Sequence, residues 1–134
     1  GHADEPGEGG RQRPDGIMMR WRSSWIDGNP LPFIMQDLTP RVLRVSDEPD
    51  VTSHENGATG LIGASVRAGS DALLARFDAV FGASIGFGLG WAEYECGGAL
   101  IRLEFGGGRD AVTGVTIDGI RTTINSHGAR LIGR

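Results

Sequence analysis

Residues 58–82 read ATGLIGASVRAGSDALLARFDAVFG, and this stretch decides the fold. The run from Gly60 to Val66 is short and apolar, which predicts a buried strand. Ser70 is a good helix N-cap, and Gly82 fits the position just past a helix end. Between them, apolar side chains recur at helical spacing: Leu73, Leu74, Phe77, Val80 and Phe81. The stretch therefore predicts a strand followed by a helix.

The sequence after this helix predicts a hairpin of two strands. Residues 85–96 and 99–105 are rich in apolar and aromatic residues, and Gly97–Gly98 between them is typical of a tight turn. Side chains alternate along the second strand, so Arg102 and Glu104 share one face. Together with the preceding elements, this predicts a strand–helix–strand–strand unit.

An internal repeat links this unit to the C-terminal part of the chain. Ala58–Leu61 (ATGL) matches Val112–Val115 (VTGV). In the second copy, a strand is predicted up to Asp118, one or two helical turns around Ile120–His127, and a short strand at 129–132. The repeat therefore predicts a second β-α-β segment.

The N-terminal part predicts another hairpin. Strand-like residues 17–26 and 31–38 flank Asp-Gly-Asn-Pro at 27–30, which is a strong turn signal. Residues 39–57 contain many turn-forming residues and predict a linker, with a short strand at 42–45.

Residues 1–16 are rich in Gly, Pro and charged side chains and lack a hydrophobic period, so we expect a mobile, disordered tail. Gly1–His2 without an initiator Met resembles the remnant of a tag, which leaves open that the chain is a fragment of a longer protein.

Composition narrows the classes of partner. The 134 residues suit one domain, and a net charge of −4 with a pI near 5.3 argues against binding nucleic acid or an anionic membrane. No apolar run reaches the roughly 18 to 20 residues that span a bilayer. Cys96 is the single cysteine, so an internal disulfide is excluded, and a cytoplasmic location is expected.

The order of the segments PDGIMMRWR, LPFIMQD, NGATGLIGASV and GVTIDG, over about residues 14–133, resembles the glyoxalase-like branch of the vicinal oxygen chelate superfamily. The resemblance implies an α+β fold in which paired βαβββ modules form a curved sheet around a cup, with helices outside. Module one would span 58–106, and module two would combine 17–38 with 112–133. Alternatively, two chains exchange these pieces, which implies a homodimer.

Enzymes of that superfamily hold a divalent metal ion with side chains from the first and last strands of each module. Carried over, the last-strand positions fall on Glu104 and Gln36, whereas the first-strand positions fall on Leu61 and Val115, which cannot bind a metal. His54, in a loop before a first strand, could replace one ligand, although a solvated turn is the simpler explanation. The resemblance thus implies an incomplete metal site.

Other side chains could line the cup. Arg102 and Glu104 are either an ordinary half-exposed pair or a desolvated pair inside the cup, where the carboxylate could act as a base. Trp21 and Trp91 could line a ligand cup with Gln36, or be plain core residues.

These expectations lead to two functions. The first is a glyoxalase-like domain that binds a small organic molecule in the cup without a complete metal site. The alternative is a metal-dependent lyase, isomerase or dioxygenase of the same superfamily that uses Glu104. A third interpretation is that the chain is half of a longer enzyme and is inactive by itself. Whether the chain is an enzyme stays open at this point.

Overall fold

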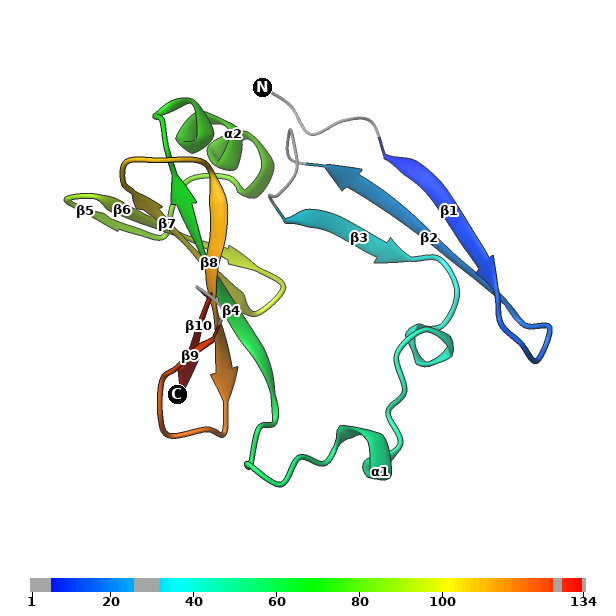
Figure 1. The fold of residues 1–134 in the computed structure, drawn as a ribbon. Coiled ribbons are helices and arrows are strands. Elements are labelled where there is room, and N and C mark those ends of the chain that lie inside the picture. Colours follow the sequence, from blue (N-terminus) through cyan, green and yellow to red (C-terminus); the bar gives the residue numbers. More distant parts are fainter. Residues whose placement is uncertain (1–5, 26–31, 127–128, 134) are drawn as a thin grey trace.

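The computed structural model describes residues 6–25, 32–126 and 129–133, and its strands form two separate sheets (Figure 1). The N-terminal sheet is antiparallel and has the order β1-β2-β3, with bounds β1 Gly7–Gln12, β2 Met18–Trp25 and β3 Phe33–Asp37. The second sheet has seven strands in the order β5-β6-β7-β4-β8-β10-β9. Its bounds are β4 Gly60–Ala68, β5 Gly86–Gly88, β6 Trp91–Cys96, β7 Ala99–Phe105, β8 Ala111–Asp118, β9 Ile124–Ser126 and β10 Ala129–Gly133. The fold is mixed α+β, mostly strands, with curved sheets.

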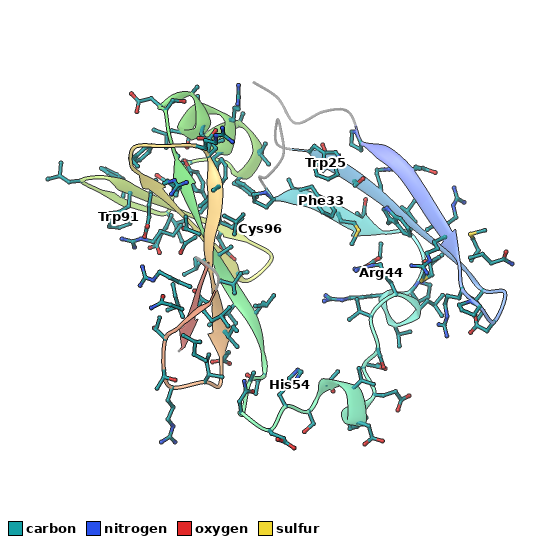
Figure 2. The ribbon with its side chains drawn as sticks, viewed as in Figure 1. Trp25, Phe33, Arg44, His54, Trp91 and Cys96 are labelled. Carbon is teal, nitrogen blue, oxygen red and sulfur yellow. The ribbon has the colours of Figure 1, made fainter. Side chains whose placement is uncertain are left out.

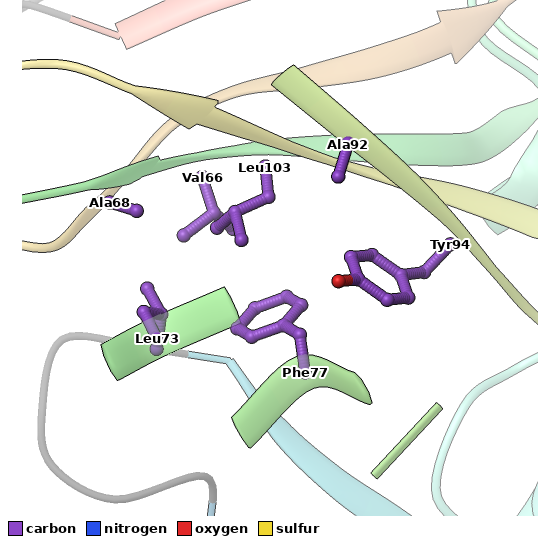
Figure 3. Close-up of a cluster of buried hydrophobic side chains, with 7 residues drawn as sticks. All are labelled: Val66, Ala68, Leu73, Phe77, Ala92, Tyr94 and Leu103. Atoms are coloured by element: carbon purple, nitrogen blue, oxygen red, sulfur yellow. The ribbon is translucent and has the colours of Figure 1, made fainter. Parts of the chain in front are cut away.

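Helix α2 (Ala72–Phe81) covers one face of the seven-stranded sheet and forms the core with it (Figure 3). The core side chains come from α2, β4, β6 and β7: Val66, Ala68, Leu73, Phe77, Ala92, Tyr94 and Leu103. The hydroxyl of Tyr94 donates a hydrogen bond to Asp78 Oδ1 at 2.7 Å. Burial, followed by this hydrogen bond, raises the pKa of Tyr94 well above its ordinary value. The predicted strand and amphipathic helix are thus confirmed, whereas the N-cap predicted at Ser70 is wrong, because Asp71 occupies that position.

The predicted hairpin after α2 is confirmed as β6 and β7, whereas the single strand expected over 85–96 is wrong, because a turn at 89–90 divides it into β5 and β6. Gly97 and Gly98 have φ angles of 57° and 84°, which are the left-handed values that a tight two-residue hairpin turn needs. The succession β4-α2-β5-β6-β7 is a βαβββ series, and β7 returns to lie parallel to β4.

The seven-stranded sheet has two similar halves. At its centre β4 and β8 are antiparallel; β7 is parallel to β4, and β10 is parallel to β8. The next strands outward, β6 and β9, are both antiparallel to their inner neighbours. The two copies of the internal sequence repeat thus correspond to these two halves of the sheet. The second half differs in having no helix among its described residues.

The helical turns expected around Ile120–His127 are wrong, because Ile124–Ser126 forms β9. The β-branched residues Thr122, Thr123 and Ile124 favour an extended backbone, and Ile124 pairs with Leu131 of β10. Residues 127 and 128 lie outside the described residues.

The N-terminal hairpin is confirmed as β2 and β3, while its turn at 27–30 lies outside the described residues. The expected disordered tail is wrong for residues 7–12, which pair with β2 as β1. Glu8 lies opposite Arg22 and binds both Arg22 (3.2 Å) and Arg20 (2.8 Å), and these partners lower its pKa. The tag remnant expected at residues 1 and 2 lies outside the described residues.

The linker contains a 3₁₀ turn, η1 (Arg41–Leu43), and a short helix, α1 (Pro49–Thr52), so the short strand expected at 42–45 is wrong. Arg44 ties the start of the linker to the end of β3, because its Nε and Nη2 donate to the two carboxylate oxygens of Asp37 at 2.7 and 2.9 Å. This fork-shaped contact lowers the pKa of Asp37 and raises that of Arg44.

The second module expected from 17–38 and 112–133 is not formed within one chain. Both edges of β2 are already paired, to β1 and β3, and β8 is paired to β4 and β10. The two segments therefore belong to different sheets (Figure 1), and the sheets approach each other where Phe33 and Met35 of β3 line a recess with Phe81, Cys96 and Ile101. In the part of the chain that the structure describes, no helix is long and apolar enough to cross a membrane.

Candidate functional site

Three predicted site residues converge on the face of the seven-stranded sheet opposite α2. Residues 92, 94 and 103 point into the core, so strand alternation directs Trp91, Glu93, Arg102 and Glu104 to the other face. Arg102 lies at the centre of this group, with Nη1 3.6 Å from Glu93 Oε2 and Nε 3.3 Å from Glu104 Oε1. We call these four residues the sheet cluster.

The ring of Trp91 is held flat against the sheet from two sides. The guanidinium carbon of Arg102 lies 4.3 Å from the ring centroid, which is a cation–π contact. On the neighbouring strand, a Cβ at Gly88 would be 2.5 Å from Trp91 Nε1, so only glycine leaves room for the ring. Gly88 is therefore required by the packing of the Trp91 ring.

The polar face continues onto β4. Ser65 lies beside Arg102 and Arg67 beside Glu104 in the parallel pairing of β4 with β7. Arg67 is held in place because its Nε donates to the carbonyl of Arg109 at 2.9 Å. One face of this sheet thus carries the apolar core, and the other carries charged and aromatic side chains.

The exposure of the sheet cluster decides between the two interpretations of Arg102 and Glu104. The side chains of Glu93, Arg102 and Glu104 are 28%, 38% and 46% exposed. Within one chain they form a half-exposed, mutually paired group, and the desolvated carboxylate expected inside a cup is not observed.

Gln36 and Trp21 lie in the other sheet. Gln36 is opposite Arg22, whereas Trp21 is opposite Asp37 and therefore on the other face of the N-terminal sheet. Figure 2 places Trp91 on the far side of the seven-stranded sheet from Trp25 and Phe33. The chain alone therefore does not bring Gln36 or Trp21 to Glu104.

His54 lies in the linker and lines an open pocket of about 500 Å³ between the linker and the ends of β4 and β8 (Figure 2). The apolar part of its lining is Val45, Val51, Ala58, Leu61 and Ile117. The hydroxyl of Thr52 donates to the carbonyl of Glu48 at 3.0 Å, and the hydroxyl of Thr59 donates to Asp118 Oδ2 at 3.2 Å. We call this recess the linker pocket.

The predicted metal ligands Glu104, Gln36 and His54 lie on three different parts of the fold. Among the described residues, no group of three His, Cys, Asp or Glu side chains is arranged to hold a metal ion. The geometry of one chain therefore does not bring the expected ligand set together.

Glu93 was not among the site residues predicted from the sequence. The signal that could have found it is the hairpin register, because a two-residue turn at 97–98 places Glu93 directly opposite Arg102. The linker pocket had no comparable signal, since it depends on the path of residues 39–57 in three dimensions.

Comparisons with known proteins inform the fold alone. No family model matches the chain, and no curated protein matches it. Among solved structures, the chain is similar to one titled "Crystal Structure of a hypothetical protein from Staphylococcus aureus", with a TM-score of 0.68 and 12% sequence identity. The match covers 98% of this chain and 56% of that one, so the chain spans just over half the length of that protein.

Proposed function

We propose that this chain is a binding domain for a small organic molecule, which lies on the sheet cluster and needs no complete metal site. The observation that carries the proposal is the convergence of Trp91, Arg102 and Glu104, with Glu93, on the face that α2 leaves free. Binding sites commonly combine an aromatic surface with a few polar groups that fix orientation.

The chemistry of the sheet cluster suggests the class of ligand. Nε and Nη1 of Arg102 face the two carboxylates, while Nη2 takes part in neither ion pair. A guanidinium binds carboxylates and similar acceptors with a fork of N–H groups, and Trp91 offers an aromatic ring beside it. A planar organic molecule with an acceptor group, such as an aromatic acid or amide, matches both features.

The topology supports the same class of domain. The βαβββ series of β4-α2-β5-β6-β7 is the module that the resemblance to glyoxalase-like proteins implies, and Glu104 lies on its last strand. On this proposal, the curved polar face is one wall of the cup.

The test is an NMR titration of the ¹⁵N-labelled chain with benzoate, salicylate and their amides as probes. We expect saturable shifts at the Trp91 indole and at the amides of residues 91–95 and 100–105, and their loss in Arg102→Ala. Arg121→Ala, an exposed arginine in the loop before β9, is the matched control and should leave binding unchanged. Shifts elsewhere, or binding that survives Arg102→Ala, would overturn the proposal.

Metal analysis of protein purified without a chelator tests the proposal that the domain needs no complete metal site. We expect less than stoichiometric divalent metal, and the same content in Glu104→Gln. Stoichiometric metal that is lost in folded Glu104→Gln would reject this part and support a metal-dependent lyase, isomerase or dioxygenase.

A further inference from the structure

The pairing registers of the seven-stranded sheet place one row of residues across the face that carries the sheet cluster. The row crosses the neighbouring strands from β6 to β10, and its members are Glu93, Arg102, Ser65, Gly114 and Arg130. Directly paired residues on adjacent strands share a face, and Arg102 belongs to the face opposite the core. All members of this row, which we call the arginine row, therefore lie on the face that α2 leaves free.

A second observation places Arg130 on that face. A Cβ added at Gly114 would lie 3.3 Å from the Cβ of Arg130. Cβ atoms of adjacent strands come this close only on the same side of a sheet. Because Gly114 is paired with Ser65, and Ser65 with Arg102, the same side is followed without a break from one arginine to the other.

The two arginines occupy matching places in the two similar halves of the sheet. Arg102 lies on β7, the strand parallel to β4, and Arg130 lies on β10, the strand parallel to β8. Ser65 and Gly114 form the pair between them, where the antiparallel strands β4 and β8 meet. Both are buried, and neither has a side chain long enough to separate the arginines. Each half of the face thus presents one guanidinium, with only small residues between the two.

The two guanidiniums differ in how much of their charge is already neutralised. Arg102 is paired with Glu93 and Glu104. Arg130 is exposed, and none of the hydrogen bonds or ion pairs among the described residues engages its side chain. A guanidinium has five N–H donors and no acceptor, so all the donors of Arg130 are available to an external acceptor. The half of the face around β10 therefore offers a second, uncompensated place for an anionic group.

We propose that this face binds an organic molecule with an acidic group at each end, one held by Arg102 and the other by Arg130. The inference rests on the proposed function, in which Trp91 and Arg102 hold one end of the ligand, and it adds the second anchor. A site with two matching halves suits a molecule with two matching ends. The uncompensated charge of Arg130 makes the second end of the ligand an acid and not a neutral group.

The spacing of the strands sets the length of the ligand. Three strand spacings separate the two arginines, which puts their Cα atoms roughly 14 Å apart. A carboxylate carbon sits roughly 4 Å from a guanidinium carbon, so two upright side chains leave roughly 6 Å between the acidic carbons. The side chain of Arg102 leans toward Trp91, away from Arg130, which widens the separation to roughly 10 Å. Rigid aromatic diacids of this length match the site.

Matched pairs of probes test the proposal by NMR titration of the ¹⁵N-labelled full chain. Terephthalate and biphenyl-4,4′-dicarboxylate are each compared with their own monomethyl ester, which keeps the aromatic body and one acid. We expect at least one diacid to bind about tenfold more tightly than its ester, because it adds one charge-assisted contact. The diacid should also shift the amides of residues 130–132, whereas the ester should shift only those around Trp91 and Arg102.

Variants of the second anchor give the decisive comparison. Arg130→Gln should remove the preference for the diacid and leave binding of the ester unchanged, and Arg130→Lys, which keeps the charge, should retain most of the preference. Arg121→Gln, the same change at an exposed arginine outside the row, is the matched control and should alter neither affinity. The spectrum of each free variant checks its fold, and Arg130→Ala replaces the glutamine variant if that one does not fold.

The outcomes separate this inference from the function on which it rests. Equal affinities of both diacids and their esters, or a preference that survives in folded Arg130→Gln, would sink the second anchor. Ester binding around Trp91 in the same experiment would leave the proposed function standing. A chain that binds neither the diacids nor the esters would refute both.

Discussion

The two sheets are built by the same local rule and differ in what covers them. In each, a tryptophan ring lies over a glycine of the neighbouring strand: a Cβ would be 2.7 Å from Trp21 Nε1 at Gly9, and 2.5 Å from Trp91 Nε1 at Gly88. The seven-stranded sheet adds α2 and a buried core, whereas no described residue of the N-terminal strands is buried. Both sheets thus pair their strands in the same way, whereas only the sheet that α2 covers has a buried core to stabilise it.

Truncating Phe77, at the centre of the core, should have the largest effect on the free energy of unfolding. Phe77→Ala leaves a cavity between α2 and β6, beside the rings of Phe81 and Tyr94, whose centroids lie 5.4 and 5.5 Å from that of Phe77. We expect the free energy of unfolding in urea to fall by about 3–5 kcal/mol. Phe87→Ala, the same change at a 79% exposed position, should stay within about 0.5 kcal/mol. Equal effects of the two would contradict the comparison.

The next effect concerns the polar contact at the edge of the same core. Tyr94→Phe removes the hydrogen bond to Asp78 and should cost about 1–3 kcal/mol at neutral pH. Because the folded state raises the pKa of Tyr94, this stabilisation is complete below about pH 10 and is lost as the pH rises further.

The pH dependence has a direct readout, since Tyr94 is the single tyrosine of the chain. The near-ultraviolet absorbance of tyrosinate should appear only well above pH 10 while the chain is folded. The phenylalanine variant should lack this alkaline loss of stability. A tyrosine that titrates near pH 10 in the folded chain would show that its hydroxyl is accessible.

The smallest effects compare the two tryptophan–glycine contacts directly. Gly88→Ala forces the Trp91 ring out of its place on the face opposite the core and should lower the global free energy of unfolding by about 0.5–1.5 kcal/mol. Gly9→Ala should loosen only the pairing of β1, so hydrogen exchange rises at residues 7–12 while the midpoint in urea is unchanged. Gly107→Ala, where a Cβ meets no atom, is the neutral control. A global loss in Gly9→Ala would mean that the sheets are one cooperative unit.

The elements predicted correctly are those whose signals are short in range. The helical spacing between Ser70 and Gly82 and the Gly97–Gly98 turn depend on nearby residues, and strand alternation placed Arg102 and Glu104 on one face. Strand β1 was missed because its residues, GEGGRQ, carry no apolar alternation, and its pairing is a backbone ladder to β2 that forms only across the turn.

Long-range assembly was the part that the sequence could not decide. Gln36 has the alternation expected of a site residue, but which sheet its strand joins depends on the free edges available in three dimensions. The same holds for His54, whose position follows the path of the linker. The candidate site was therefore predictable strand by strand and unpredictable where two sheets had to meet.

The linker between the sheets is fastened at both ends. Arg44 holds Asp37 at its start, and the amide of Thr59 donates to the carbonyl of Asp118 at its end. The entropic cost of closing such a loop rises by only about 0.6 kcal/mol for each doubling of its length. Insertions or deletions in the linker would therefore change the distance that it can span between the two sheets at little cost in stability. Evolution could thereby convert a self-contained protein into an intertwined assembly, or reverse the change, while leaving both layers intact.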